Sequence, residues 1–396
     1  MKNILIAIRS IFKKGRHNVM KIVSLGIGLA VGLVLIAKVY FEQSYDDFYP
    51  DRDRVYQVWA KYQQNGGELK DYPQTSGGIA PTMQQQIPEI ETVTRYTSFG
   101  DWTFTMTDTK MKYSGRCIIA DSCFFDILPR PMLIGNAKEV LSTPMYVLIS
   151  SRIAKNIGGD VIGKNFTVDN SPGRTMTIGG VFEEVPENSH SRYDVIVSMA
   201  SAGRFMWEGS PTNMLGNDRY ISYVKLHKGV NPLALEEQVR TFVNSYFPPE
   251  EQQKVGLSID FSFHKLDNLH KELPQVKRMT WILSLLAFAL IFTAVMNYIL
   301  IVISSIVNRS KEVAVHKCYG ASENNIHGMM FGEALVHIVL SLILALLLIL
   351  AFRGTVEELL ATSLDSLLLS NGSLVLLGIC ILVFFVSGFM PGSLYA

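Results

Sequence analysis

Long apolar runs alternate with polar stretches and divide the chain into membrane and soluble parts. Residues 19–40, 279–307 and 329–352 each reach the length of about 20 residues that an apolar helix needs to cross a bilayer. A fourth run, 372–391, is shorter but sufficient when its polar ends lie at the membrane interface. The pattern therefore predicts four transmembrane helices.

Between the first two runs, residues 41–278 contain no apolar run long enough to span a membrane. Alternating or continuously apolar stretches predict strands at Arg54–Tyr62, Thr175–Val185, Tyr193–Met199 and Tyr220–Leu226. Asn231-Pro232 predicts the start of a helix that Pro248-Pro249 ends. We therefore expect an integral membrane protein in which a four-span α-helical bundle holds a large α+β domain, of two lobes, between spans one and two.

Lysine and arginine placement predicts the orientation of the spans. Residues 1–18 are basic and amphipathic, which is typical of a helix at the cytoplasmic membrane surface. One crossing then places 41–278 outside the cytoplasm, and the second span returns the basic segment 308–328 to the inside. The connection 353–371 lies outside, and 392–396 form a cytoplasmic end.

Composition agrees with this layout. The chain is 48% hydrophobic and 18% charged, and its mean hydropathy is +0.22. A net charge of +1 excludes the overall basic surface that nucleic-acid binding requires. Four cysteines are too few for a disulfide scaffold. Cys117 and Cys123 either pair in an oxidising compartment or remain small buried thiols.

Three motifs resemble catalytic or ligand-binding sites, but none has the residues and spacing that such a site requires. Gly158–Asn165 fits G-x-x-x-x-G-K but lacks the Ser or Thr that ligates magnesium, and a helix precedes it where a nucleotide loop needs a strand. Two histidine groups are close in sequence, but neighbouring positions do not establish a triad or a metal site. They are Ser189, His190 and Asp194, and His264, Asp267 and His270. We predict no catalytic residue and no metal, and we interpret His190 as a surface or capping residue.

Polar and small residues inside the spans offer two further hypotheses. Glu333 and His337 are four residues apart, and an ionisable pair inside a membrane is a candidate for proton coupling. Helix packing or snorkelling is the alternative, because both lie near the end of the span. Glycines permit close helix approach, including at a dimer interface. These are Gly26, Gly28, Gly32 and Gly378.

The amino-acid sequences of several segments resemble those of a known family. The stretch R-S-K-E-V-A-V-H-K-C-Y-G-A-S at 309–322 resembles the loop between the second and third membrane helices of FtsX/MacB-type ABC transporter permeases. Four soluble segments are similar to parts of the periplasmic core domain of this family: 45–56, 119–126, 150–158 and 180–190. The subgroup common in Bacteroidetes-like bacteria is the most similar. The resemblance implies a multi-pass protein of the bacterial inner membrane, with the domain 41–278 in the periplasm. Because members of this family usually continue past the last span, the resemblance also implies that a chain ending at Ala396 is a truncated or a half-length form.

The resemblance also implies how such a chain works. A separate cytoplasmic ABC ATPase would bind ATP and Mg²⁺, and this chain would hold no cofactor. The ATPase would dock on 308–328 through Arg309, Lys311, Glu312, Lys317, Gly320, Ala321 and Ser322. Taken alone, the charges of this loop favour a solvated segment that follows the positive-inside rule; the family resemblance favours docking.

The resulting expectation is a non-catalytic permease subunit that transmits ATP-driven motion to the periplasmic domain for export or extraction of hydrophobic or peptide substrates. Its partners would be the ATPase, a second permease copy or half, the lipid bilayer, and a periplasmic adaptor with an outer-membrane duct. The alternatives are a mechanical regulator of an envelope enzyme, a lipoprotein-releasing permease and an ATP-independent membrane sensor.

Overall fold

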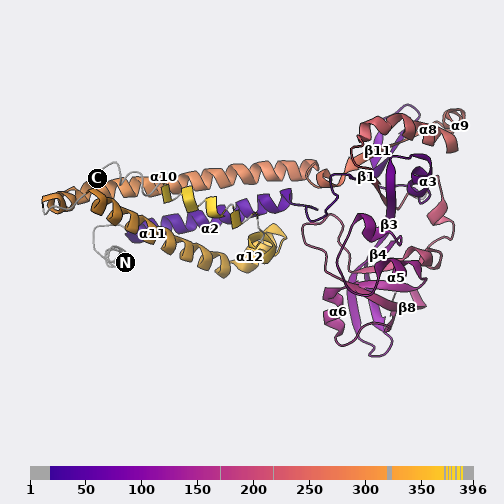
Figure 1. The fold of residues 1–396 in the computed structure, drawn as a ribbon, viewed down its shortest axis with the longest axis horizontal. Helices are drawn as coiled ribbons and strands as arrows, with labels where there is room; N and C mark the ends of the chain where they lie inside the picture. Colours follow the sequence, from indigo (N-terminus) through magenta and orange to yellow (C-terminus); the bar gives the residue numbers. More distant parts are fainter. Residues whose placement is uncertain are drawn as a thin grey trace. The chain divides into compact units, whose positions relative to one another are not determined.

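The computed structural model describes residues 18–169, 171–216, 218–318 and 323–369, and from the last segment residues 372, 374–375, 377–379, 381–383 and 385–386. Two compact units make up the chain. A helical unit comprises Met1–Ser44 and Glu272–Ala396, and an α+β unit comprises Tyr45–Lys271 (Figure 1). The expected basic helix 1–18 lies, apart from Asn18, outside the described residues, as does the end 392–396, and only scattered residues of the fourth run are described.

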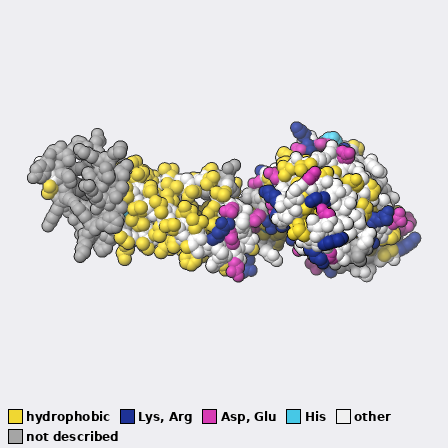
Figure 2. Space-filling view, turned by 90° about the horizontal axis from the view of Figure 1, so that it is seen from below, with side chains coloured by type: hydrophobic (Ala, Val, Ile, Leu, Met, Phe, Trp, Pro, Cys, Tyr) yellow, Lys and Arg dark blue, Asp and Glu magenta, His cyan; other side chains and the backbone are white. Residues whose placement is uncertain are grey.

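Three long helices form the core of the helical unit: α2 (Asn18–Gln43), α10 (Pro274–Cys318) and α11 (Glu323–Ala351). Each contains a stretch long and apolar enough to cross a membrane, at Val19–Gln43, Pro274–Leu300 and Ala334–Ala351. Figure 2 shows apolar side chains over most of the described surface of this unit, whereas charged side chains are spread over the α+β unit. Two short helices, α12 (Arg353–Leu360) and α13 (Leu364–Leu368), follow α11.

The segment 308–328, which we expected to be a loop, is helical wherever the structure describes it. Helix α10 continues without a break to Cys318, and α11 already begins at Glu323. Residues 308–318 contain neither glycine nor proline, and Lys, Arg, Glu and Ala are good helix formers. Charge ends the apolar stretch but not the helix.

Glycines of α2 set the packing of the helical unit. A Cβ atom on Gly28 would collide with the Cβ of Ala294 in α10, and one on Gly32 would lie 2.7 Å from Cγ1 of Ile291. Gly26 faces Leu344 of α11 in the same way. Small residues at this spacing let helix backbones approach closely inside a membrane. These three glycines therefore pack against α10 and α11 of the same chain.

The α+β unit is built on one sheet. Among the described residues eleven strands join it, in the order β11-β1-β10-β3-β4-β9-β6-β8-β5, with β2 beside β1 and β7 beside β3 and β8. The strands are β1 (Val55–Gln64), β2 (Lys70–Tyr72), β3 (Ile90–Met106), β4 (Lys112–Ala120), β5 (Met132–Ile134), β6 (Tyr146–Ser150), β7 (Asn165–Val168), β8 (Ser171–Phe182), β9 (Val195–Ser198), β10 (Ile221–Leu226) and β11 (Leu257–Lys265). The helices are α3 (Ile79–Gln86), α4 (Phe124–Ile127), α5 (Ala137–Ser142), α6 (Ser151–Ile157), α7 (Ala202–Phe205), α8 (Glu236–Tyr246) and α9 (Pro249–Val255). All four expected strands are present.

Strand β3 links the two ends of this sheet. Its first half pairs with β10 and its second half with β4 and β7. The pairing with β4 shifts between Ser98 and Gly100, and Gly100 has a φ of +75° that favours glycine. One apolar cluster packs α3 and α8 on β1, β10 and β11, and another fills the end formed by β6, β8 and β9. A third cluster joins them.

Helix packing on Gly28 yields a stability prediction. Gly28→Ala places a methyl group against Ala294 and should lower the free energy of unfolding in detergent by about 1–3 kcal/mol, as overpacking does. Adding Ala294→Gly should restore most of this loss. Gly354→Ala in α12 is the control, because a Cβ there meets nothing within 4 Å. Thermal unfolding of the four proteins checks it, and equal effects at positions 28 and 354 would contradict the packing.

Candidate functional site

The predicted docking residues divide into two groups. Arg309, Lys311, Glu312 and Lys317 lie on the last turns of α10, so one helix joins them to the apolar stretch that ends at Leu300. Gly320, Ala321 and Ser322 lie outside the described residues, as does the side chain of Glu333. Its expected partner His337 is buried in α11.

The two connections of the α+β unit to the rest of the chain are tied together. Asp47, in the incoming connection, pairs with Arg52 at 3.2 Å and with Lys271 of the outgoing connection at 3.5 Å. Asp267 pairs with Lys271 at 2.8 Å and with Arg52 at 3.7 Å. The incoming and outgoing segments therefore share one network of four alternating charges.

An aromatic stack reinforces this network. The rings of Tyr45 and His270 are parallel within 6°, with centroids 3.4 Å apart. Partial burial raises the pKa of Asp267, but the hydrogen bond and charge of Lys271 outweigh it, and the pKa lies below its usual value. The Asp267 carboxylate is thus charged at neutral pH, and the stability that it contributes is lost only in acid, as the pH falls through this lowered pKa.

A second set of contacts, which we call the Asp46 anchor, holds the incoming chain. Asp46 is fully buried, and its φ of +60° is left-handed. Its backbone N–H donates to the carbonyl of Asn188 at 2.9 Å, and its carboxylate accepts from the hydroxyl of Ser189 at 2.9 Å. The other carboxylate oxygen lies 2.6 Å from Nδ1 of His190. Asp46 comes only three residues after the last residue of α2, so the anchor fixes the chain where it leaves this helix.

The interpretation of His190 as a surface or capping residue was wrong. Its side chain is only 17% exposed, and its Nε2 contacts the hydroxyl of Tyr223 and, at 3.1 Å, that of Ser191. Burial raises the pKa of Tyr223 well above its usual value, so this phenol stays protonated. The anchor could not be predicted from neighbouring residues, because Asp46 lies 144 positions before His190 in the chain.

Asp46, His190 and Ser191 contact one another in the order Asp–His–Ser, as in a hydrolase triad. The serine is not accessible to a substrate. Ser191 is 4% exposed, and its hydroxyl also bonds the hydroxyl of Tyr96 at 2.6 Å. A nucleophile must be reached by its substrate, and this one is enclosed. Asp194, which we had considered as the acid, pairs instead with Arg152 at 2.5 Å.

The other sequence motifs have structural explanations. Gly158, Gly159 and Gly163 all have positive φ and form the turn from α6 to β7, so a helix precedes and a strand follows. His264 stacks on Trp59 at 4.1 Å. Within the described ranges no group of three His, Cys, Asp or Glu side chains is placed to hold a metal. Cys117 and Cys123 are free thiols, and burial raises the pKa of both.

An ion pair at the end of α2 was missed by sequence reasoning. Nζ of Lys38 lies 2.6 Å from Oε1 of Glu42, and the two side chains are only 8% and 5% exposed. Lys38 also donates to the hydroxyl of Thr362 at 2.8 Å. Buried charges in a membrane helix are costly and mark functional positions. The signal was the i, i+4 spacing of opposite charges inside an apolar run; the pair fixes α2 to the segment between α12 and α13.

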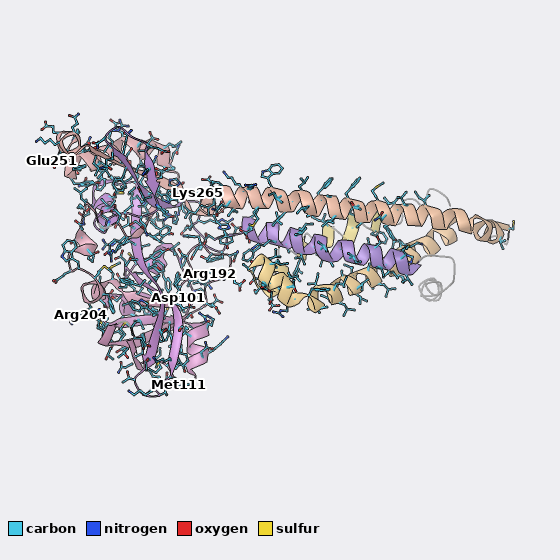
Figure 3. The ribbon with its side chains drawn as sticks, turned by 180° about the vertical axis from the view of Figure 1, so that it is seen from behind. Asp101, Met111, Arg192, Arg204, Glu251 and Lys265 are labelled. Atoms are coloured by element: carbon cyan, nitrogen blue, oxygen red, sulfur yellow. The ribbon has the colours of Figure 1, made fainter. Side chains whose placement is uncertain are left out.

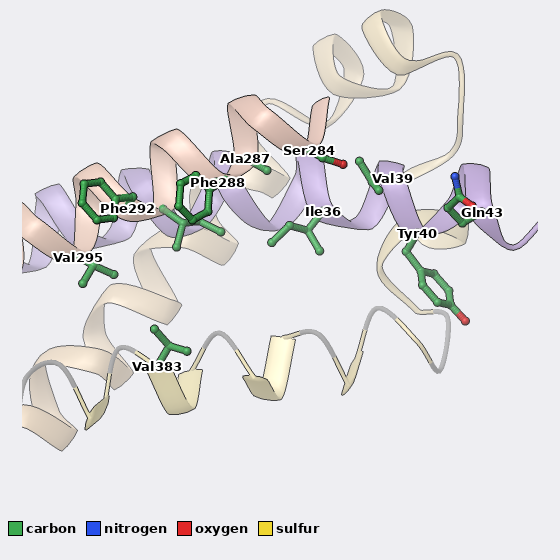
Figure 4. A pocket seen from close by; sticks show the side chains of 11 residues that line it. Ile36, Val39, Tyr40, Gln43, Ser284, Ala287, Phe288, Phe292, Val295 and Val383 are labelled. Carbon is green, nitrogen blue, oxygen red and sulfur yellow. The ribbon is translucent and has the colours of Figure 1, made fainter. Parts of the chain in front are cut away.

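A cavity of about 570 Å³ lies beside α2 and α10 (Figure 4). Its wall is almost entirely apolar and includes Ile36, Phe288, Phe292 and Val383. Tyr40 and Gln43 contribute polar groups on the α2 side. The cavity suits an apolar chain rather than a polar solute.

Comparison with known families identifies the architecture. The family described as MacB-like periplasmic core domain matches residues 20–242, which is more than half of the chain. The chain belongs to the FtsX/MacB-type permease family. The FtsX-like permease C-terminal family matches residues 284–396, which include the later membrane helices and the predicted docking residues. The protein is thus an ABC transporter permease, and its family implies an ATPase partner.

A solved structure agrees with this assignment. The permease is 33% identical to a domain named as that of a permease from Porphyromonas gingivalis, over 55% of this chain and 91% of that one, with a TM-score of 0.50. It also matches the extracellular domain of the noncanonic ABC-type transporter YknZ from Gram-positive bacteria, at 11% identity and a TM-score of 0.36, over 52% of this chain and 98% of that one. No curated protein matches the chain.

Mutation of Asp46 tests the contribution of the Asp46 anchor to stability. Asp46→Ala removes the acceptor for Ser189 and His190, and should lower the free energy of unfolding of the α+β unit by about 2–3 kcal/mol because buried polar groups lose their partner. Amide hydrogen exchange of residues 183–194 should accelerate. Asp53→Ala, at an exposed aspartate seven residues further along the chain, should change stability by less than about 0.5 kcal/mol. Unchanged exchange at 183–194 in Asp46→Ala would show that the anchor does not hold this loop.

Proposed function

We propose that this permease is the membrane subunit of a bacterial inner-membrane ABC transporter that transmits the motion of a separate ATPase to its α+β domain in the periplasm. ATP and Mg²⁺ would bind to the ATPase. The moving domain would export or extract hydrophobic or peptide substrates. A second permease copy or half completes the assembly, and a periplasmic adaptor and an outer-membrane duct are further partners.

The continuity of α10 is the observation that supports this proposal. The helix begins at Pro274, three residues after the α+β unit ends at Lys271, and ends at Cys318, beyond Lys311 and Glu312. Its 45 residues correspond to a length of about 68 Å. The hydrocarbon core of a bilayer is only about 30 Å thick. A single helix is therefore long enough to cross the membrane and still extend beyond it, which suits the transfer of a displacement along its axis.

The contacts at the base of the α+β unit complement this helix. Force applied along α10 reaches Lys271 through two intervening residues and then meets Asp267 and Asp47. Force applied along α2 reaches Asp46 through Ser44 and Tyr45. Short connections with buried or paired side chains leave little slack, so displacement of either helix is passed on to the domain.

The apolar cavity beside α2 and α10 favours a second candidate within the same class. A lipoprotein-releasing permease must receive an acyl chain from the bilayer, and an apolar cavity of about 570 Å³ offers a place for one. Each buried methylene of such a chain contributes about 0.8 kcal/mol. This candidate keeps the ATPase and the transmission of force, and changes only the cargo.

Docking of the ATPase is tested by co-purification from a membrane extract. The native chain should retain ATP hydrolysis, and Lys311→Ala with Glu312→Ala should lower the recovered activity about tenfold, as loss of interface hot spots does. Lys277→Ala with Arg278→Ala changes exposed residues at the other end of α10 and is the matched control. Recovery of equal activity with all three chains would move the docking site away from 309–318.

Transmission through α10 is tested by two insertions after Val307. Four alanines lengthen the helix, whereas four glycines break its continuity at a cost of about 1 kcal/mol each. ATP should change the hydrogen exchange of residues 45–271 in the native chain and in the alanine insertion. In the glycine insertion, ATP hydrolysis should persist while this change is lost. An unaltered ATP response with glycine would refute a rigid α10 as the transmitting element.

A further inference from the structure

A small cavity on the α+β unit is lined almost wholly by charged side chains. Its volume is about 260 Å³, and seven of its nine lining residues are charged: Asp101, Arg116, Arg152, Glu184, Glu187, Arg192 and Asp194. Three guanidinium groups and four carboxylates meet there. Figure 3 shows Asp101 and Arg192 on the same side of the unit. Sequence analysis found no signal for this site, because its residues come from four separate segments.

One wall of the cavity is fixed by internal pairs. Arg152 pairs with Asp194 at 2.5 Å and with Glu184 at 3.3 Å. The second oxygen of Asp194 accepts from the backbone N–H of Arg116 at 2.9 Å. The Asp194 backbone exchanges hydrogen bonds with Arg116 and Ser150 at 2.8 Å each. This wall is therefore a preorganised scaffold whose charges already satisfy one another.

The remaining charged side chains of the lining are available for a ligand. Arg192 is exposed, and its guanidinium forms no ion pair or hydrogen bond with any described residue. Arg116 and Asp101 are 4.0 Å apart, the limit of an ion pair, and their side chains are 49% and 77% exposed. Two guanidinium groups and one carboxylate can thus accept a partner without breaking a tight internal pair.

We propose that this cavity binds a small zwitterion, such as an amino acid or a short peptide with both ends free. The ligand carboxylate pairs with Arg192 and Arg116, because guanidinium groups hold carboxylates through paired hydrogen bonds. The ligand ammonium pairs with Asp101. Arg152 positions the wall and does not contact the ligand.

The mixed charge of the lining explains the preference. A ligand with only a negative charge makes no contact with Asp101, and one with only a positive charge makes none with Arg192 and Arg116. A zwitterion places each charge against its opposite, and the wrong partners are rejected by like charges. The cavity is smaller than the several hundred Å³ of sites for drug-sized molecules, which limits the ligand to a few atoms on either side of its charges.

Calorimetric titration of the full chain in nanodiscs, without ATP, tests this assignment with three probes. They are the dipeptide Ala-Ala, its N-acetyl derivative and its C-terminal amide. Ala-Ala should bind, and each blocked probe should bind about tenfold more weakly or worse, because each lacks one charge-assisted contact. No binding of Ala-Ala, or equal binding of the acetylated probe, overturns the assignment.

Variants place the binding in this cavity. Arg192→Gln should weaken Ala-Ala about tenfold or more, as loss of a charged hydrogen-bond partner does. Asp101→Asn should reduce the preference for Ala-Ala over the acetylated probe. Arg204→Gln is the control, because Arg204 is also exposed but lies away from the cavity (Figure 3). Equal affinity of native and Arg192→Gln chains overturns the site. ATPase binding is not needed for this measurement, so its failure leaves the proposed transport role untouched.

Discussion

The uninterrupted hydrogen-bond ladder of α10 is the constraint on which the rest of the structure depends. A backbone that crosses a bilayer must satisfy its polar groups internally, and a helix does so along its whole length. Nothing in 308–318 ends the ladder, so the same helix continues out of the apolar stretch into the charged segment. This continuity is the basis of the proposed transmission of a displacement along α10 to the contacts around Lys271.

Two energetically costly arrangements lie on the path along which we propose that a displacement is received. Asp46 holds a left-handed backbone, which costs a non-glycine residue about 1–2 kcal/mol. Lys38 and Glu42 are buried as an ion pair at the end of α2, although desolvation offsets much of their attraction. Both positions lie on the short path from α2 into the α+β unit. Neither the left-handed Asp46 backbone nor the buried Lys38–Glu42 pair is explained by stability alone. Both are explained if the geometry of this path has to be fixed.

The sequence predicted the elements that depend on local patterns and failed where distant residues meet. Three apolar helices and four strands were predictable, because apolar run length and alternation are properties of single segments. The loop 308–328 was predicted too long because the charged residues were assumed to end the helix. Helix propensity and the absence of Gly and Pro instead determine where the helix ends. His190 was misinterpreted because its partner Asp46 is far away in the chain, and the charged cavity was invisible for the same reason. The pair of Lys38 and Glu42 was also missed, although its i, i+4 spacing is a local signal.

One irregular segment, 183–194, connects the cavity with the Asp46 anchor. Glu184, Glu187, Arg192 and Asp194 line the cavity, and Ser189 and His190 hold Asp46. The segment lies between β8 and β9 and is fixed by side-chain contacts such as the hydrogen bond from Arg130 to the carbonyl of Glu184 at 2.7 Å. A ligand that draws Arg192 inward acts on backbone only two residues from His190. The ligand proposed for the cavity would therefore act on the same irregular segment that holds the Asp46 anchor.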